Sequence, residues 1–231
     1  MNKFRLSSRL LSNVFWDSVL SNTEINDGRN AKLLSELSDL EKLRKDAEYN
    51  TGSISNAAAW CLYCLVKYFV PQNIMEIGTF IGKSSWSMAK AQDDGYIENC
   101  YLVTCDFSND ITIPWIGKTK FKQYKKQSST DMLLAEKETP DMVFLDGRFQ
   151  KEDLILFGKL ISENTIIMID DFEGSEKGVI NYIQLKKIEK LNQHFLIYPC
   201  GQSNLKKIGI SSHSTLAVML PIKLIELVAQ G

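Results

Sequence analysis

A glycine-bearing turn between an apolar strand and a helix constrains this fold more than any other feature of the sequence. The turn lies in the run Glu-Ile-Gly-Thr-Phe-Ile-Gly-Lys-Ser at positions 76–84. The apolar residues Ile74, Met75 and Ile77 fit a short buried strand. The helical pattern that follows carries Trp86, Met88 and Ala89. Gly78 and Gly82 therefore stand at the two ends of the turn, where glycine permits a positive φ and a close approach of the backbone to a ligand.

The start of this helix is typical of an anion site, because free N–H groups and a partial positive charge meet there, and Ser84 adds a hydroxyl. The glycine spacing, G-x-x-x-G-K-S, matches neither the dinucleotide fingerprint nor the phosphate loop, which needs one residue more. Glu76 would repel a pyrophosphate but would attract the ammonium group of an amino-acid-like ligand. S-adenosylmethionine carries both an ammonium and a carboxylate.

A second apolar strand is predicted at 101–105, and it ends at Asp106. In a doubly wound sheet, ligands bind outside the carboxyl ends of the strands, where an acidic residue can accept hydrogen bonds from both ribose hydroxyls. Asp106 is therefore a candidate ribose ligand. The alternative is a solvated aspartate in the polar turn at 106–110.

Three further aspartates follow two later strands of the predicted sheet. Strands at 140–147 and 165–171 flank a helical pattern at 151–161, which predicts a right-handed strand-helix-strand unit. Asp146, Asp170 and Asp171 should then meet at one sheet edge. Such carboxylates repel one another unless they are protonated, paired with basic residues or bound to a cation, and oxygen ligands suit Mg²⁺, Ca²⁺ or Mn²⁺. The alternative is an Asp-Asp pair that caps the loop.

The pattern E-x-G-x-x-x-G-x-S resembles motif I of class I S-adenosylmethionine-dependent methyltransferases, above all the methyltransferase domain 24 family and the catechol/caffeoyl-CoA O-methyltransferase-like group. The resemblance covers roughly residues 50–222. It implies an α/β fold with a Rossmann-like, doubly wound, seven-stranded sheet in the order 3-2-1-4-5-7-6, closed by an antiparallel hairpin with a short loop. We expect an N-terminal helical extension at 1–49 and the methyltransferase domain at 50–231.

The resemblance also implies roles for particular residues. Those implied at the cofactor are Glu76, Gly78, Thr79, Gly82, Ser84, Asp106, Ser129, Thr130 and Asp146. Those implied at a divalent cation are Asp146, Asp170 and Asp171. The candidate catalytic residues are Asp146, Asp170 and Lys151, of which Lys151 lies outside the family pattern and is a candidate because the family base is missing.

Three segments depart from the family pattern or allow a second interpretation. Phe149 stands where the catechol group has its lysine base, so Lys151 would have to reach back. Ser129 and Thr130 match the adenine-contacting segment, but the run 128–131 is also a good helix N-cap sequence. Residues 50–52 loosely match the glycine-containing stretch that closes over the sulfonium, and the alternative is a helix entry capped by Ser53 or Ser55.

Composition narrows the partners. The chain has 231 residues with 27 basic and 28 acidic side chains, so bulk charge does not favour nucleic acid. Five scattered cysteines, including the Cys61–Cys64 pair in an apolar helix pattern, favour core packing in a reducing compartment. With no signal pattern or membrane span recognised, we expect a soluble, cytoplasmic protein without membrane partners. An amphipathic helix at 33–43 should pack on its own domain. A homo-oligomer is possible, and the sequence does not decide the oligomeric state.

These features together predict an enzyme, a methyltransferase that uses S-adenosylmethionine to methylate a hydroxyl of a small molecule, with Mg²⁺ or another divalent cation assisting. One alternative is a non-catalytic S-adenosylmethionine-binding protein of the same fold. The other is a dinucleotide-binding oxidoreductase. The sequence does not specify the methyl acceptor.

Overall fold

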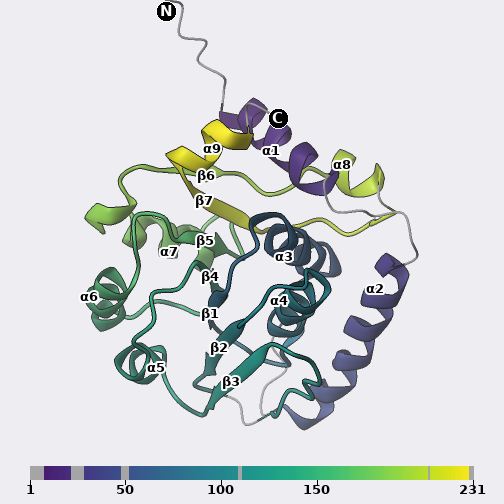
Figure 1. Ribbon diagram of the computed structural model, residues 1–231, viewed down its shortest axis with the longest axis horizontal. Helices are drawn as coiled ribbons and strands as arrows, with labels where there is room; N and C mark the ends of the chain where they lie inside the picture. The colour runs from purple at the N-terminus through teal and green to yellow at the C-terminus, as the bar shows by residue number, and fades with distance from the viewer. Residues whose placement is uncertain (1–7, 22–28, 48–51, 109–110, 208, 229–231) are drawn as a thin grey trace, which may run out of the picture.

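The fold is built on one seven-stranded sheet (Figure 1), seen in a computed structural model that describes residues 8–21, 29–47, 52–108, 111–207 and 209–228. The sheet order is β3-β2-β1-β4-β5-β7-β6, as predicted. All neighbours pair in parallel except β7, which is antiparallel to both β5 and β6. The strands are β1 (Asn73–Ile77), β2 (Tyr101–Asp106), β3 (Lys120–Lys125), β4 (Met142–Leu145), β5 (Ile166–Ile169), β6 (His194–Ile197) and β7 (Ala217–Pro221).

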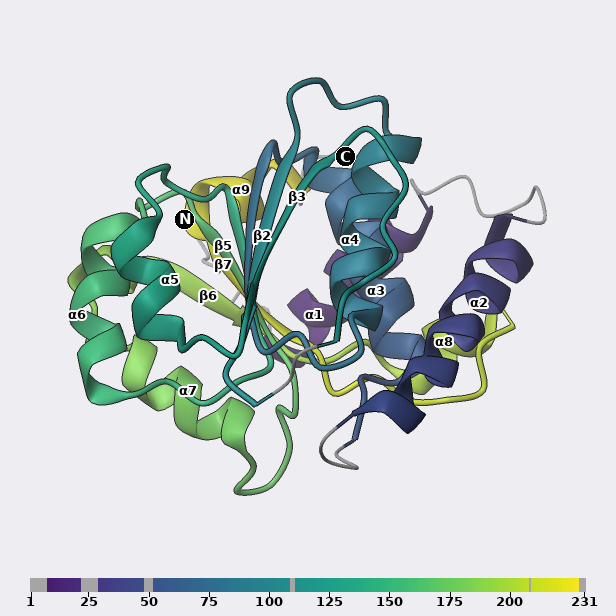
Figure 2. The same cartoon turned by 90° about the horizontal axis from the view of Figure 1, so that it is seen from below.

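Helices cover both faces of the sheet. Figure 2 shows α5, α6 and α7 on one face and α3 and α4 on the other, with α2 outside them. The α-helices are α1 (Ser8–Ser21), α2 (Arg29–Leu40), α3 (Asn56–Phe69), α4 (Lys83–Asp94), α5 (Ser129–Ala135), α6 (Lys151–Leu160), α7 (Lys177–Leu185), α8 (Gln202–Lys207) and α9 (Ile222–Val228). Two 3-10 helices, η1 (Glu41–Asp46) and η2 (Glu189–Leu191), follow α2 and α7. This layered, doubly wound arrangement is the expected Rossmann-like fold.

Strands β4 and β5 are apolar throughout because each of their faces is buried under helices. Phe144 and Met168 belong to the core cluster on the side of α3 and α4. Their neighbours Val143 and Ile167 belong to the cluster on the side of α5, α6 and α7. Successive side chains thus enter opposite cores, as the two-residue period of a strand requires.

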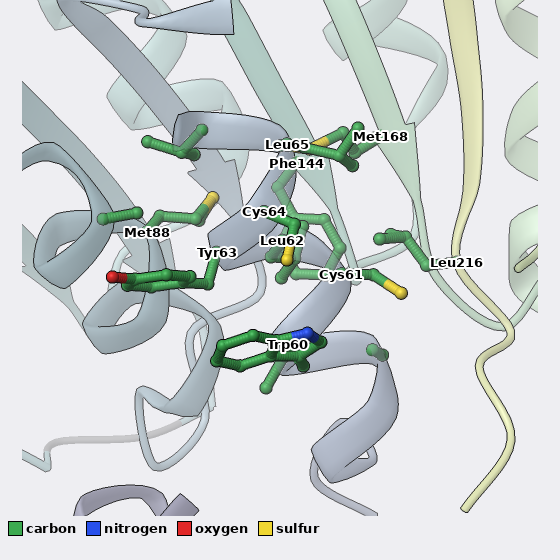
Figure 3. Close-up of a cluster of buried hydrophobic side chains, with 14 of the residues drawn as sticks. Trp60, Cys61, Leu62, Tyr63, Cys64, Leu65, Met88, Phe144, Met168 and Leu216 are labelled. Atoms are coloured by element: carbon green, nitrogen blue, oxygen red, sulfur yellow. The ribbon is translucent and has the colours of Figure 1, made fainter. Parts of the chain in front are cut away.

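Helix α3 forms the centre of the first core. Its residues from 57 to 66 are all buried, and Figure 3 shows Leu65 beside Phe144 and Met168 of the sheet. Cys61 and Cys64 are buried here as free thiols. Their prediction as core residues is confirmed.

The connection between β6 and β7 differs from the predicted short loop. It runs from residue 198 to 216 and contains α8. The chain does not turn straight back after β6, because Leu205 and Ile210 of the connection are buried in the core on the α3 side.

The N-terminal segment is helical where the structure describes it. The apolar stripe predicted at 33–43 is divided between α2 and η1, and Leu33, Leu37 and Leu40 are buried. The boundary expected at residues 49–50 lies outside the described residues. Among the helices described, none combines the length and apolar character needed to cross a membrane.

Candidate active site

A cavity of about 750 Å³ opens at the carboxyl ends of β1, β2, β4 and β5. Its volume lies within the range of small-molecule sites. Of the residues predicted for the site, those that line it are Gly78, Asp106, Ser129, Asp146, Asp170 and Asp171. Those outside its lining are Glu76, Thr79, Gly82, Ser84, Thr130 and Lys151. The sheet edge therefore gathers a ribose candidate and three aspartates around one cavity.

The glycine turn after β1 has the predicted backbone. Gly78 and Gly82 have φ values of 98° and 79°. A Cβ atom on Gly78 would lie 2.6 Å from the backbone nitrogen of Gly147, so the ends of β1 and β4 meet backbone to backbone. Gly82 is the N-cap of α4 in the left-handed region. Only glycine at position 78 permits both this φ and this contact.

Glu76, two residues before Gly78, connects the elements around the turn through buried hydrogen bonds. Its side chain is fully buried and accepts hydrogen bonds from Ser85 Oγ and from Thr104 Oγ1, the latter at 2.6 Å. Burial raises the pKa of Glu76 to about 7, although these hydroxyl donors oppose the shift. The carboxyl group thus connects β1 to β2 and α4, and a direct contact with an ammonium in the cavity has no support from its position.

Asp106 connects the loops that follow β1 and β2. Its Oδ2 accepts from the backbone N–H of Phe80 at 2.6 Å, and its Oδ1 accepts from the N–H and hydroxyl of Ser108 at 2.9 and 2.8 Å. Phe80 itself has a positive φ of 47°. The carboxylate is held by three donors and still lines the cavity, so it is not the freely solvated turn residue of the alternative interpretation.

The segment predicted to border adenine is a helix start. Ser128 caps α5 in a capping box with Asp131, which confirms the N-cap interpretation. The hydroxyls of Ser129 and Thr130 each donate to Asp153 on α6 at 2.7 Å. Asp153 is fully buried, and sequence reasoning missed it because its partners lie more than 20 residues away.

The structure brings together Asp146, Asp170 and Asp171, as expected, but around a lysine. Nζ of Lys177 lies 2.6 Å from Asp146 Oδ1 and 3.1 Å from Asp171 Oδ2. Asp170 accepts a hydrogen bond at its Oδ1 from the Thr215 hydroxyl at 2.7 Å. Lys177 is the functional candidate that sequence reasoning missed. Its place in the first turn of α7, the helix that follows the Asp-Asp pair, was a usable signal.

Three carboxyl groups and one ammonium share this cluster, so full ionisation of all three carboxyl groups would leave a net negative charge. Burial raises the pKa of Asp146 to about 8, and the neighbouring Asp170 and Asp171 add to the shift against the attraction of Lys177. Burial also raises the pKa of Asp170. Burial opposes the charge on Lys177, but the carboxylates outweigh it and its pKa lies above the usual value.

The described side chains do not fit the divalent cation predicted from the sequence. No group of three or more His, Cys, Asp or Glu residues in the described ranges is arranged to hold a metal ion. Two of the three expected ligands, Asp146 and Asp171, are paired with Lys177 instead. The arrangement presents an ammonium where the resemblance placed a metal.

The loop after β4 departs from the expected base. Lys151 is the first residue of α6 and is exposed outside the cavity lining. Phe149 packs edge-on against Phe157 with ring centroids 5.0 Å apart, and so faces the core. Arg148 and Gln150, which were not predicted for the site, line the cavity instead.

Residues before α3 and β7 complete the cavity wall. Ser55 caps α3, accepting from the N–H of Ala58 at 3.0 Å, so the helix-entry interpretation is confirmed there. Gly52 and Ser55 also line the cavity, together with His213, whose carbonyl accepts from the Ser55 hydroxyl at 2.9 Å. Residues 50 and 51, which loosely match the family stretch, lie outside the described residues.

Comparison with known proteins places this fold among methyltransferases. No protein-family model matches the chain, and no curated protein matches its sequence. The chain is similar in structure to an O-methyltransferase from Bacillus cereus in complex with S-adenosylhomocysteine, with a TM-score of 0.56 and 15% identity over 90% of this chain and 96% of that chain. It is also similar to the O-methyltransferase TomG from Streptomyces achromogenes, involved in tomaymycin synthesis and solved with S-adenosylmethionine, with a TM-score of 0.54 and 16% identity over 94% of this chain and 100% of that chain. The chain therefore shares the fold of these methyltransferases.

Proposed function

We propose that this protein is an S-adenosylmethionine-dependent methyltransferase that acts on a hydroxyl group of a small molecule. The observation that carries the proposal is the single cavity that joins the Gly78 turn, Asp106 and the aspartate cluster at the carboxyl edge of the sheet. Ligands of doubly wound folds bind at this edge. Two structural neighbours, one solved with S-adenosylhomocysteine and one with S-adenosylmethionine, support the choice of cofactor.

Each part of the cavity has a role in this proposal. When bound, S-adenosylmethionine supplies a methyl group already activated by a sulfonium. Gly78 lets the donor approach bare backbone, and Asp106 accepts hydrogen bonds from the ribose. The walls hold donor and acceptor at a separation of ~3 to 3.5 Å, which is where most of the rate gain in such a displacement arises. The aspartate cluster accepts the proton of the acceptor hydroxyl.

The proposal is tested by calorimetric titration with S-adenosylmethionine and S-adenosylhomocysteine, with NAD as the matched control. We expect both methionine-derived ligands to bind and NAD to show no heat of binding. Binding of NAD without binding of either methyl-cycle ligand would support the dinucleotide-binding alternative and remove the proposal.

A non-catalytic S-adenosylmethionine-binding protein is a second candidate, favoured by one observation: the expected base position holds Phe149, which packs in the core. Incubation with a methyl donor labelled on its methyl group and a panel of phenolic and catecholic acceptors separates the two. Labelled product supports the enzyme. Tight donor binding with no product from any acceptor supports the binding protein.

The divalent cation remains a prediction from the sequence. Asp146, Asp170 and Asp171 would hold Mg²⁺ or a similar ion only if Lys177 left its present place between two of them. The position of the Lys177 ammonium therefore decides whether a divalent cation can bind to these aspartates.

A further inference from the structure

Lys177 places a positive charge between the ends of two neighbouring strands. Asp146 follows β4 and Asp171 follows β5, and the ammonium of Lys177 contacts both carboxylates at 2.6 and 3.1 Å. The lysine side chain is 26% exposed and lines the cavity, so it faces the space that an acceptor would enter. The charge is thus at the site and within reach of a ligand.

The position of Lys177 is built into the fold. The next residue, Gly178, packs against the backbone of Asp170 and Asp171 so closely that a Cβ atom would overlap both carbonyl oxygens. The first turn of α7 can therefore lie against the end of β5 only with glycine at this position.

A second contact fixes the same helix to the loop after β4. Asn181, one turn beyond Lys177, donates from Nδ2 to the carbonyl of Gly147 at 2.8 Å and accepts from the N–H of Phe149 at 3.2 Å. Helix α7 is thereby fastened to both loops that carry the carboxylates. These contacts place the start of the helix, and with it Lys177, beside both carboxylates.

An ammonium in this place and a divalent ion exclude each other. A Mg²⁺ or Mn²⁺ ion would need the oxygens of Asp146 and Asp171 at about 2.0–2.2 Å, which are the atoms that Lys177 contacts. Two cations sharing the same oxygens would lie only a few ångströms apart and would repel each other. The site therefore has room for one of them.

We propose that Lys177 is the permanent cation of this site and a catalytic residue of the methyl transfer, so that the reaction needs no divalent ion. The inference rests on the proposed function and deepens it. An ammonium has three N–H donors, and the described contacts use two of them. The third N–H donates a hydrogen bond to the acceptor oxygen. This bond orients the oxygen toward the methyl group and stabilises the negative charge that forms on the oxygen.

The step balances without a further reactant. The acceptor oxygen forms a bond to the methyl carbon, the sulfur keeps the electron pair of the carbon–sulfur bond that breaks, and the hydroxyl proton passes to Asp171. Asp171 suits this part because its side chain is 41% exposed and returns the proton to water. Lys177 keeps its charge throughout.

The test measures Mn²⁺ binding by electron paramagnetic resonance in wild type, in Lys177→Met and in the control Lys187→Ala. Lys187 is an exposed lysine just beyond the same helix, and its Nζ donates only to Gln184 among the described residues. We expect wild type and Lys187→Ala to bind Mn²⁺ weakly and Lys177→Met to bind it roughly tenfold tighter, because the competing charge is gone. Tight Mn²⁺ binding by wild type, or no gain in the folded Lys177→Met variant, would overturn the inference.

Calorimetry with S-adenosylhomocysteine on the same samples separates this inference from the proposed function. If wild type does not bind S-adenosylhomocysteine, the proposed function is contradicted. The Mn²⁺ measurement still decides which cation the site accepts. If Lys177→Met does not fold, the wild-type measurement alone decides: weak Mn²⁺ binding supports the inference and tight binding overturns it. Methyl transfer to catechol, where it occurs, should continue in excess chelator and fall in the methionine variant.

Discussion

At the residue scale, the Asp106 side chain holds two loops together and also lines the cavity. Its two oxygens hold the backbone of Phe80 and of Ser108, and both loops border the cavity. A ribose diol would therefore meet a carboxylate that is already oriented. Such preorganisation lowers the entropy cost of binding.

We expect Asp106→Ala to weaken binding of S-adenosylmethionine by roughly tenfold to a hundredfold, since a hydrogen bond to a charged group contributes about 1.5–3 kcal/mol. Calorimetric titration measures the change. Asp39→Asn is the control, because Asp39 is an exposed residue of α2 whose side chain pairs with Lys42. An unchanged dissociation constant in Asp106→Ala would remove Asp106 from the cofactor site.

Glu76 makes the stability of the fold depend on pH. Its pKa is about 7 in the folded chain and 4.5 in the reference state, chiefly because of burial. Between these pH values the folded chain keeps a proton that the unfolded chain has released. The contribution of Glu76 to the free energy of unfolding therefore falls as the pH rises through this window.

The variant Glu76→Gln should remove this dependence. Relative to wild type, the free energy of unfolding of the variant should increase between pH 5 and pH 8 by at most about 3 kcal/mol, at 1.36 kcal/mol per pKa unit, because only wild type loses stability over this range. Urea denaturation of both proteins at the two pH values measures the difference. A difference that is the same at both values would mean that Glu76 does not hold the proton.

At the scale of elements, Lys83 connects the N-terminal segment to the glycine turn. It is 5% exposed and donates to Glu41 Oε1 at 2.9 Å, to the carbonyl of Ile54 at 3.0 Å and to Asn56 Oδ1 at 3.1 Å. On the same 3-10 helix as Glu41, Arg44 stacks over the ring of Phe80 at 5.3 Å from its centroid. Helix η1 is thus bound to the turn that shapes the cavity.

A double-mutant cycle with Lys83→Met and Glu41→Gln should measure a coupling of about 1–2 kcal/mol in the free energy of unfolding, as expected for contacting partners in one network. The ion pair between Lys42 and Asp39 is the control, because both side chains are well exposed and such pairs contribute at most about 1 kcal/mol. Equal coupling in the two cycles would show that η1 is not anchored through Lys83.

The sequence predicts those elements whose pattern is set locally. Strands β1, β4 and β5 are predicted from their short, largely apolar runs. Gly78 and Asp106 are predicted from their places at the carboxyl ends of β1 and β2. The order of the sheet then follows from the resemblance and is confirmed.

The missed features depend on contacts between distant segments. Asp153 meets Ser129 only because α6 packs beside α5, and Lys177 meets Asp146 only because Gly178 lets α7 approach the sheet. Neither helix orientation can be read from a periodic pattern. The same cause explains the predicted short loop before β7, because the burial of Leu205 depends on the finished core.

At the scale of the whole molecule, the two core clusters share the strands of one sheet. Val143 faces one cluster and Phe144 the other, so neither layer of helices can separate without exposing the strands between them. The cavity lies at the carboxyl edge of these same strands. A ligand bound there should stabilise the sheet and both layers together.

We therefore expect S-adenosylhomocysteine to raise the melting temperature of one cooperative transition. At a ligand concentration a hundred times Kd the stabilisation is about 2.7 kcal/mol, which for a chain of this size corresponds to a shift of roughly 5–10 °C. Differential scanning calorimetry measures the shift, with NAD at the same concentration as the control. A shift with NAD and none with S-adenosylhomocysteine would contradict the cofactor assignment. A transition that splits in two, with only one part moved by the ligand, would contradict the shared sheet as the unit of stability.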